Sequence, residues 1–185
     1  MKPLVILDRD GVINVESPDF IKTPEEWHPI PGSLEAIVKL NHAGYWVAVA
    51  TNQSGVGRGL FDLAMLESIH QKMRDALAKL GGHVDLVLFC PHLPDSHCEC
   101  RKPKPKLMND IATHFKIDLK KTPVPAIGDS LRDLIAAQTA GCKPLLVLTG
   151  NGQRTHENLP ADLKQIAVYS DLASAIDALL MSKAP

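Results

Sequence analysis

Short apolar runs alternate along the chain with stretches in which apolar residues recur every three or four positions. The runs cover residues 4–7, 46–50, 84–89, 124–127 and 145–148, and each is rich in Val, Ile, Leu or Ala. Apolar runs of this length are typical of strands that are buried on both faces of a parallel sheet. The pattern therefore predicts five parallel strands.

Between these runs the apolar period lengthens to that of a helix. Helices of this kind are predicted at 33–42, from Leu63 after an N-cap at Asp62, from about Lys106, at 130–140 before Gly141, and at 171–180. The polar segment 149–160 is expected to form an exposed loop, and residues 182–185 are expected to fray.

The order of these elements predicts an α/β fold, a Rossmann-like parallel sheet with helices on both faces. The 185 residues fit one domain, 1–185, with an apolar fraction of 45% that can supply its core. The intervals from Asp8 to Thr51 and from Phe89 to Arg101 are too short to hold an inserted cap domain, so we expect a capless protein.

Composition excludes several classes of partner. The formal net charge is −1 and aromatic residues make up 4% of the chain, so the sequence offers neither a basic field nor many stacking rings. No apolar run approaches the roughly 18 residues of a membrane span, and the first residues do not form a signal peptide. We expect a cytoplasmic protein with no nucleic-acid or membrane partner, and nothing demands more than a monomer.

Polar side chains follow the predicted strands at the points where the strands end. Asp8 and Asp10 follow the first run, Thr51 follows the second, Lys102 lies in a basic segment after the third, and Asp129 follows the fourth. Because the carboxyl ends of parallel strands meet at one edge of a sheet, we expect these side chains to converge. Carboxylates with Mg²⁺, a hydroxyl and a lysine suit phosphoryl transfer.

Each of these signals has an ordinary structural interpretation when it is taken alone. The segment DRDG of residues 8–11 can be a polar turn after a strand, and Thr51 with Asn52 can be another. The basic residues 101–106 can be a solvated surface run. The hypothesis of a site depends on their common position after successive strands.

A second candidate site is a short loop at 90–100 that is rich in cysteine. Cys90, His92, Cys98 and Cys100 supply the four sulfur and imidazole ligands of a closed, structural Zn²⁺ site. A redox pair at Cys98 and Cys100, or buried inert cysteines, are the alternatives, and His97 could replace His92. Cys142 lies outside the loop and is expected to pack in the core.

Four motifs in order, LDRDG, TNQSG, RKPKP and GDSLRD, resemble those of the haloacid dehalogenase-like hydrolases over nearly the whole chain. The resemblance implies a phosphatase in which Asp8 forms an aspartyl-phosphate and Asp10 acts first as an acid and then as a base. It implies that Thr51 and Lys102 hold the phosphoryl group. Mg²⁺ would be bound by Asp8, the Asp10 carbonyl and Asp129.

Two further expectations accompany these roles. Asp133 is expected to support Lys102 or a metal-bound water. Asp10 has to be protonated for the first step, and we expect the neighbouring carboxylate of Asp8 to raise its pKa.

Within the superfamily, the chain is similar to two capless, zinc-containing families. The stretches DRDGVINV, IPG and TNQSGVGRG resemble the D-glycero-D-manno-heptose 1,7-bisphosphate 7-phosphatases, whereas CPHLPDSHCECRKPKPKL is nearly as close to the histidinol-phosphate phosphatases. We favour the first, which implies hydrolysis of the C7 phosphate of a small sugar bisphosphate in lipopolysaccharide precursor biosynthesis. The expected substrate contacts are Glu16, Ser17, Pro18, Asp19, Asn52, Gln53, Ser54, Arg58 and Arg101.

Two other functional classes remain as alternatives. A zinc-ordered protein that binds a phosphorylated metabolite without turnover would keep the same scaffold, although here every catalytic position is intact. Processing of nucleic-acid ends would need a basic track beyond residues 101–106.

Overall fold

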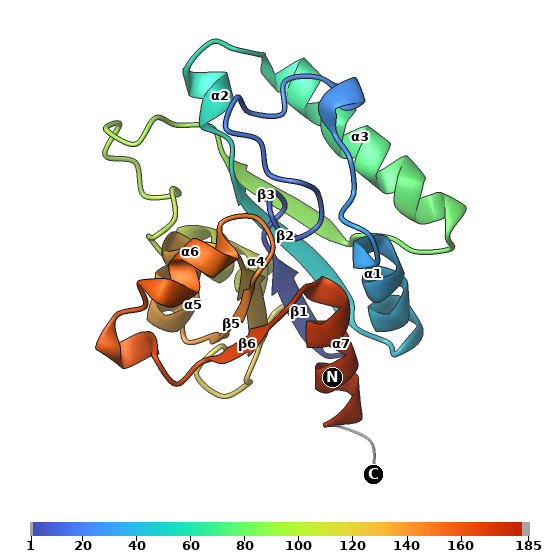
Figure 1. Ribbon diagram of the computed structural model, residues 1–185, viewed down its shortest axis with the longest axis vertical. Coiled ribbons are helices and arrows are strands. Elements are labelled where there is room, and N and C mark those ends of the chain that lie inside the picture. Colours follow the sequence, from blue (N-terminus) through green and yellow to red (C-terminus); the bar gives the residue numbers. More distant parts are fainter. Residues whose placement is uncertain (1, 183–185) are drawn as a thin grey trace.

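The computed structural model describes residues 2–182, and its centre is a six-stranded parallel sheet (Figure 1). The strands lie in the order β3-β2-β1-β4-β5-β6. Their bounds are β1 Leu4–Leu7, β2 Trp46–Asn52, β3 Leu86–Cys90, β4 Pro125–Gly128, β5 Lys143–Val147 and β6 Ala167–Tyr169. The parallel α/β fold predicted from the sequence is therefore confirmed.

Helices cover both faces of this sheet (Figure 1). On one face lie α1 Ser33–His42, α3 Leu63–Lys79 and α7 Leu172–Met181, and on the other lie α4 Lys106–His114 and α5 Leu131–Ala140. Successive residues of β1 point to opposite faces, so Val5 and Leu7 join the core under α1 and α3 while Leu4 and Ile6 join the core under α4. Both cores are apolar, which is why the strands read as continuous apolar runs.

The predicted helix ends are confirmed by their caps. The Asp62 side chain accepts a hydrogen bond from the Met65 N–H at the start of α3, and Gly141 ends α5 with a φ of 89°. Ser130 and Asp133 form a reciprocal capping box at the start of α5. Cys142 is buried in the core, as expected.

Two α-helices, one strand and two short 3₁₀ helices were not predicted. The short helix α2 Ser54–Gly57 follows β2, and the edge strand β6 has only three residues, all half-buried, so neither carries a long apolar pattern. Segment 149–160 is not the exposed loop that we expected, because it contains helix α6 Gly152–Glu157 and packs its first residues against β1 and β4. Two short 3₁₀ helices, Pro24–Glu26 and Ala161–Leu163, complete the elements.

The strand order determines where a ligand can approach. The chain runs outward from β1 to β2 and β3, then returns to the other side of β1 with β4, so the order reverses between β1 and β4. In open α/β sheets such a reversal leaves a crevice at the carboxyl ends of the strands. Asp8 follows β1 and Asp129 follows β4, so the two carboxylates flank this crevice.

The connections that pass over this edge contain few helices. In residues 2–182, the link from β1 to β2 holds one 3₁₀ helix and α1, and the link from β3 to β4 holds the cysteine loop and α4. No helix among these residues is long and apolar enough to cross a membrane. Residues 183–185, part of the predicted frayed end, lie outside the described residues.

Candidate active site

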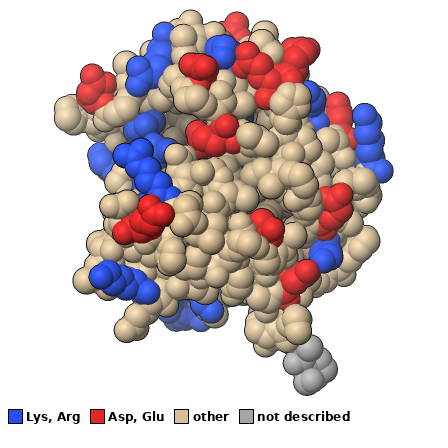
Figure 2. All heavy atoms as spheres, in the orientation of Figure 1, with Lys and Arg blue, Asp and Glu red and all other residues tan. Residues whose placement is uncertain are grey.

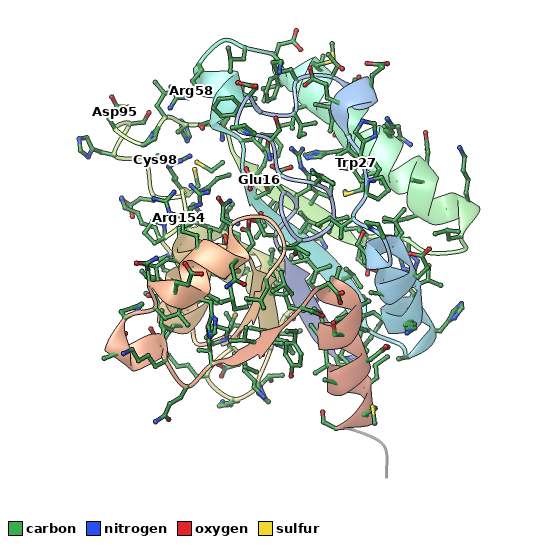
Figure 3. The ribbon with its side chains drawn as sticks, viewed as in Figure 1. Glu16, Trp27, Arg58, Asp95, Cys98 and Arg154 are labelled. Atoms are coloured by element: carbon green, nitrogen blue, oxygen red, sulfur yellow. The ribbon has the colours of Figure 1, made fainter. Side chains whose placement is uncertain are left out.

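A polar cavity of about 180 Å³ opens at the carboxyl edge of the sheet. In Figure 2 a hollow is visible near the top of this face, with acidic side chains inside it and basic side chains along one side. Figure 3 places Glu16 at its centre, above the strand ends. The lining residues come from the segments after β1 and β2, from the cysteine loop and from α5: Asp8, Asp10, Glu16, Ser17, Pro18, Phe20, Ile21, Thr51, Asn52, Gln53, Ser54, Arg101 and Arg132.

Lys102 lies buried behind Asp8 and is not among the residues that line the cavity. The Lys102 ammonium lies 3.0 Å from Asp8 Oδ1 and 2.6 Å from Asp133 Oδ1, and it donates to the Ala50 carbonyl oxygen at 2.7 Å. Lys102 is only 2% exposed, so these three oxygens are what stabilises its buried charge. The two carboxylates also raise the pKa of Lys102 in spite of its burial, which keeps the ammonium charged.

Asp133 is fully engaged within the protein. Its Oδ2 accepts from the Ser130 N–H at 3.0 Å and from the Ser130 hydroxyl, while Oδ1 faces Lys102. Burial acts to raise the pKa of Asp133, but the charge of Lys102 and these hydrogen bonds hold it below its ordinary value. The geometry agrees with the expected role of supporting Lys102.

The loop that precedes α6 fixes Asp129 through two hydrogen bonds. Its Oδ2 accepts from the Asn151 backbone N–H at 2.7 Å and from the Asn151 side-chain amide at 3.1 Å. That loop is fixed in turn to the turn after β1, since the Thr149 hydroxyl donates to the Gly11 carbonyl oxygen at 2.6 Å. A Cβ at Gly11 would lie 2.1 Å from Asp129 Oδ2, and one at Gly150 would lie 2.2 Å from it. Both positions therefore require glycine.

The oxygens of Asp8, Asp129 and Asp133 lie within 4.8 Å of one another. Burial, and then the charge of Asp133, raise the pKa of Asp8 to about 8 and that of Asp129 to about 7. This excess of negative charge is what a divalent cation would relieve. Asp129 Oδ1 and the Asp10 carbonyl oxygen accept none of the hydrogen bonds found in residues 2–182. Oxygen ligands of this kind fit Mg²⁺.

Asp10 lies beside this cluster in an environment of hydrogen-bond donors. The Arg9 guanidinium donates to its two oxygens from Nε and Nη2, each at 3.0 Å, and the Asn14 and Gln53 amides donate at 2.9 and 2.8 Å. Burial acts to raise the pKa of Asp10, but the charge of Arg9 and these hydrogen bonds lower it below the ordinary value. Our expectation of a raised pKa is therefore wrong for the protein alone, because the charge of Arg9 and the hydrogen bonds outweigh the effects that raise it.

Arg9 is itself fully buried and reaches a histidine of α3. Its Nη1 lies 3.1 Å from Nε2 of His70, and the two side chains are 0% and 1% exposed. Burial, and then the nearby charge of Arg9, lower the pKa of His70 to about 3. The imidazole is neutral at physiological pH and accepts the hydrogen bond.

The last residues of β2, Thr51 and Asn52, and the residues that follow them close the other side of the cavity. Thr51 is buried, and its hydroxyl accepts from the Gln53 amide at 2.9 Å, which leaves the hydroxyl hydrogen free to donate to a ligand. Asn52 both donates to the Lys102 carbonyl oxygen and accepts from the Lys102 N–H, each at 3.1 Å. Its amide therefore fixes the Lys102 segment, although the residue also lines the cavity.

Three arginines gather at the rim near the cysteine loop. Arg101 and Arg132 line the cavity, and none of the ion pairs found in residues 2–182 involves either of them or Arg58. The pKa of Arg101 is lowered by burial and then by the charges of Arg132 and Arg58. Glu16 and Asp133 attract Arg132 at longer range than an ion pair, and the guanidinium groups of Arg101 and Arg132 together form a place for an anion.

The structure brings most of the predicted substrate contacts together, with two exceptions. Asp19 is exposed and does not line the cavity, and Arg58 is exposed with its guanidinium 5.6 Å from the centre of the Phe20 ring. Phe20, Ile21 and Arg132 line the cavity and were missed. Arg132 lies inside the GDSLRD motif, one residue before Asp133, so the motif itself was the only available signal.

Glu16 connects the substrate side of the cavity with the metal side. Its Oε2 accepts from the Asn151 amide at 3.0 Å, and the same amide donates to Asp129. Burial, and then the charges of Asp10 and Asp8, raise the pKa of Glu16 to about 7.

The ligand atoms of the four predicted zinc ligands lie close together and join the two ends of the cysteine loop. The Sγ atoms of Cys90 and Cys100 lie 3.6 and 3.7 Å from that of Cys98, and His92 Nδ1 lies 3.5 Å from Cys90 Sγ. A tetrahedral Zn²⁺ with Zn–S of about 2.3 Å and Zn–N of about 2.0 Å separates its ligand atoms by about 3.8 Å for two sulfurs and about 3.5 Å for sulfur and nitrogen. The cluster therefore fits zinc, although the distance from Cys90 Sγ to Cys100 Sγ is shorter, at 3.1 Å. All four cysteines are free thiols.

Comparison with known proteins gives a consistent result. A family model described as HAD-hydrolase-like matches residues 99–175. The chain is 50% identical over 180 residues to the D-glycero-beta-D-manno-heptose-1,7-bisphosphate 7-phosphatase of Pseudomonas aeruginosa, covering 97% of this chain and 98% of that protein. The relative of the same name from Bordetella bronchiseptica is 53% identical, covering 96% and 97%.

Solved structures of heptose bisphosphate phosphatases are similar to this chain as well. The crystal structure of D,D-heptose 1,7-bisphosphate phosphatase from B. bronchiseptica, complexed with magnesium and phosphate, is similar with a TM-score of 0.92 and 52% sequence identity. The match covers 97% of this chain and 99% of that one. That from Burkholderia thailandensis gives a TM-score of 0.74 at 47% identity, with 97% and 99% coverage.

The buried histidine makes a prediction about stability. Because the pKa of His70 is about 3 in the folded protein and about 6.5 when it is exposed, the unfolded chain binds one more proton between these values. The free energy of unfolding should then fall as the pH drops below 6.5, by up to about 1.4 kcal/mol per pH unit from this residue alone. His70→Gln should remove that part of the slope in urea unfolding between pH 7 and 4.5. His156→Gln, at an exposed histidine of α6, is the control, and parallel curves for wild type and His70→Gln would contradict the prediction.

Proposed function

This chain belongs to the D-glycero-beta-D-manno-heptose-1,7-bisphosphate 7-phosphatases of the HAD-like hydrolases, and from that premise we propose that it hydrolyses the C7 phosphate of this heptose bisphosphate. The C1 phosphate would remain, as a step toward lipopolysaccharide precursors. We propose that residues 1–185 act as one catalytic domain, as a cytoplasmic monomer. The single observation that carries the substrate is the pair of arginines, Arg101 and Arg132, that lines the cavity beside an intact phosphatase site.

The first step is an attack by the Asp8 carboxylate. A carboxylate oxygen of Asp8 forms a bond to phosphorus, the bond from phosphorus to the C7 oxygen breaks, and its electron pair stays on that oxygen. Lys102, which contacts Asp8, and the Thr51 hydroxyl, which lines the cavity, would stabilise the charge on the phosphoryl oxygens. Mg²⁺ bound by Asp8, the Asp10 carbonyl and Asp129 would supply further positive charge against the same oxygens and keep Asp8 ionised.

Asp10 moves the proton in both steps. As an acid it gives its proton to the departing C7 oxygen, and as a base it then takes a proton from the water that attacks the phosphorus of the aspartyl-phosphate. Phosphate leaves and Asp8 is regenerated. Arg9 favours the ionised form in the free protein, and the negative phosphoryl group of a bound substrate opposes that effect by raising the pKa. Asp10 would therefore gain its proton in the complex.

The arginines at the rim favour a second anionic group over a cation. Arg101 and Arg132 line the same cavity as Asp8, so a phosphate at the far end of a short sugar can lie against them while its other phosphate lies at Asp8. Histidinol phosphate instead carries an ammonium and an imidazole at that end, which the guanidinium groups would repel. This supports the bisphosphate over the histidinol alternative.

Zinc would act at a distance from the chemistry. We propose that Cys90, His92, Cys98 and Cys100 bind one Zn²⁺ that orders the loop before Arg101 and Lys102. Binding of structural zinc contributes about 10 kcal/mol or more of apparent free energy. This is enough to order a segment whose outer residues, Pro94 to His97, are exposed.

The substrate assignment is tested by phosphate release with Mg²⁺. We expect the β anomer of heptose 1,7-bisphosphate to be hydrolysed with the highest kcat/KM, the α anomer more slowly, and histidinol phosphate hardly at all. Asp8→Asn, which removes the nucleophile, should lower the rate by at least about a thousandfold. Preference for histidinol phosphate would refute the assignment. Binding of the bisphosphate without turnover by the wild-type protein would indicate a binding protein instead.

A second prediction concerns the remote phosphate. Arg132→Gln should raise the KM for the bisphosphate by about tenfold or more, the value of one charge-assisted hydrogen bond, with kcat nearly unchanged. For p-nitrophenyl phosphate, which lacks a second phosphate, KM should not change. Arg154→Gln is the matched control, because Arg154 is an exposed arginine of α6 that does not line the cavity (Figure 3). An equal effect on both substrates would show that Arg132 does not contact the second phosphate.

A third prediction concerns the metal of the loop. Purified protein should contain about one Zn²⁺ per chain by atomic absorption, and Cys98→Ser should lose it. Activity with saturating Mg²⁺ should fall by about tenfold or more, because Arg101 and Lys102 lose their support. Cys142→Ala, which changes the cysteine outside the cluster, should keep its zinc. Zinc-free wild-type protein with full activity would refute the proposed role.

A further inference from the structure

Arg9, between the two catalytic aspartates, is the most enclosed charge near the site. Its side chain is 0% exposed, and its Nε and Nη2 both donate to the Asp10 carboxylate at 3.0 Å. The remaining nitrogen, Nη1, points away from Asp10 and lies 3.1 Å from Nε2 of His70, in the middle of α3. Helix α3 thus contacts the catalytic carboxylate through one intervening side chain.

The chemistry of the two partners explains why a histidine suits this place. A guanidinium has five N–H groups and no acceptor, so a buried one needs acceptors on more than one edge. The pKa of His70, lowered to about 3, keeps Nε2 unprotonated and able to accept. A carboxylate at position 70 would compete with Asp10 for the charge of Arg9, whereas a neutral acceptor fixes the guanidinium and leaves that charge to Asp10.

We propose that His70 is a positioning residue, which acts through Arg9 to hold the Asp10 carboxylate in the orientation from which it protonates the leaving oxygen. The inference rests on the function proposed above, because it needs Asp10 as the acid. Asn14 and Gln53 hold the same carboxylate from its other sides, each through an amide. Loss of the His70 acceptor would let the guanidinium turn and carry the carboxylate with it.

Such a role has a kinetic signature that a purely structural role lacks. When the bond from phosphorus to oxygen breaks, an alkoxide such as the C7 oxygen needs a proton, whereas p-nitrophenolate leaves without one. Asp10 also acts as the base in the second step, which is common to both substrates, but kcat/KM reports only the steps up to departure of the leaving group. A displaced acid should therefore lower kcat/KM for an alkyl phosphate and leave kcat/KM for the aryl phosphate nearly unchanged. General distortion of the site should lower kcat/KM equally for the alkyl and the aryl phosphate.

The test compares His70→Phe with His70→Gln on both kinds of substrate. Phenylalanine removes the acceptor and keeps an aromatic ring, 6.0 Å from the Phe89 ring in the wild-type pair, and glutamine keeps an acceptor for Arg9. We expect kcat/KM of His70→Phe on heptose 1,7-bisphosphate to fall by about tenfold or more, a part of the 10²–10⁴ that general acid catalysis contributes. The value of kcat/KM on p-nitrophenyl phosphate should stay within about threefold of that of the wild type. His70→Gln should recover most of the loss.

Arg9→Lys gives a second test if His70→Phe does not fold. Lysine keeps the charge but cannot donate to both Asp10 oxygens and His70 together, so the same selective loss on the alkyl phosphate is expected. The proposal would be overturned by equal losses of kcat/KM on both substrates. It would also be overturned if His70→Gln were as slow as His70→Phe on the alkyl phosphate.

The wild-type enzyme separates this proposal from the proposed function. If it hydrolyses other alkyl phosphates but not the heptose bisphosphate, the substrate assignment fails, and the same comparison on those alkyl phosphates decides the role of His70. If it hydrolyses no phosphate monoester, both proposals fail.

Discussion

The concentration of buried negative charge where β1 and β4 end is the constraint on which the rest of the site depends. Asp8, Asp129 and Asp133 lie within 4.8 Å of one another, and within residues 2–182 the one ammonium that contacts any of them belongs to Lys102. Carboxylates this close raise one another's pKa and destabilise the fold unless positive charge is supplied. The protein supplies part of it with Lys102. The remainder is left to a ligand, and this is why the same edge suits a cation and a phosphoryl group.

The residues at the strand ends could be predicted to lie together, because the carboxyl ends of parallel strands all lie at one edge of the sheet. Once the apolar runs are taken as strands, Asp8, Thr51 and Asp129 must meet at one edge, and no side-chain contact has to be known in advance. The cluster of Cys90, His92, Cys98 and Cys100 was predictable for a different reason, since the order and spacing of these residues within one short loop already bring the four atoms together. Order along the chain determined both results.

Contacts between distant segments were not predictable in this way. Asn151 reaches Asp129 across 22 positions and Glu16 across 135, from a segment whose polar composition resembles a surface loop. His70 carries the period of a helix face and gives no sign that it meets Arg9, 61 positions earlier. The pKa of Asp10 was misjudged for the same reason. Its lower value depends on where the Arg9 side chain turns, and adjacency in sequence to a basic residue does not specify that.

The hydrogen bonds to Asp129 have a consequence for how this sequence can vary. The shorter of the two bonds from Asn151 comes from its backbone N–H, which every residue except proline possesses, and only the longer one comes from the side chain. Glu16, by contrast, is contacted by the side-chain amide alone. Position 151 can therefore vary and keep the shorter of the two hydrogen bonds to Asp129, whereas Gly150 beside it cannot vary. In related proteins we expect an invariant glycine next to a variable residue, and that variable residue would alter the substrate side of the cavity while the metal side stays the same.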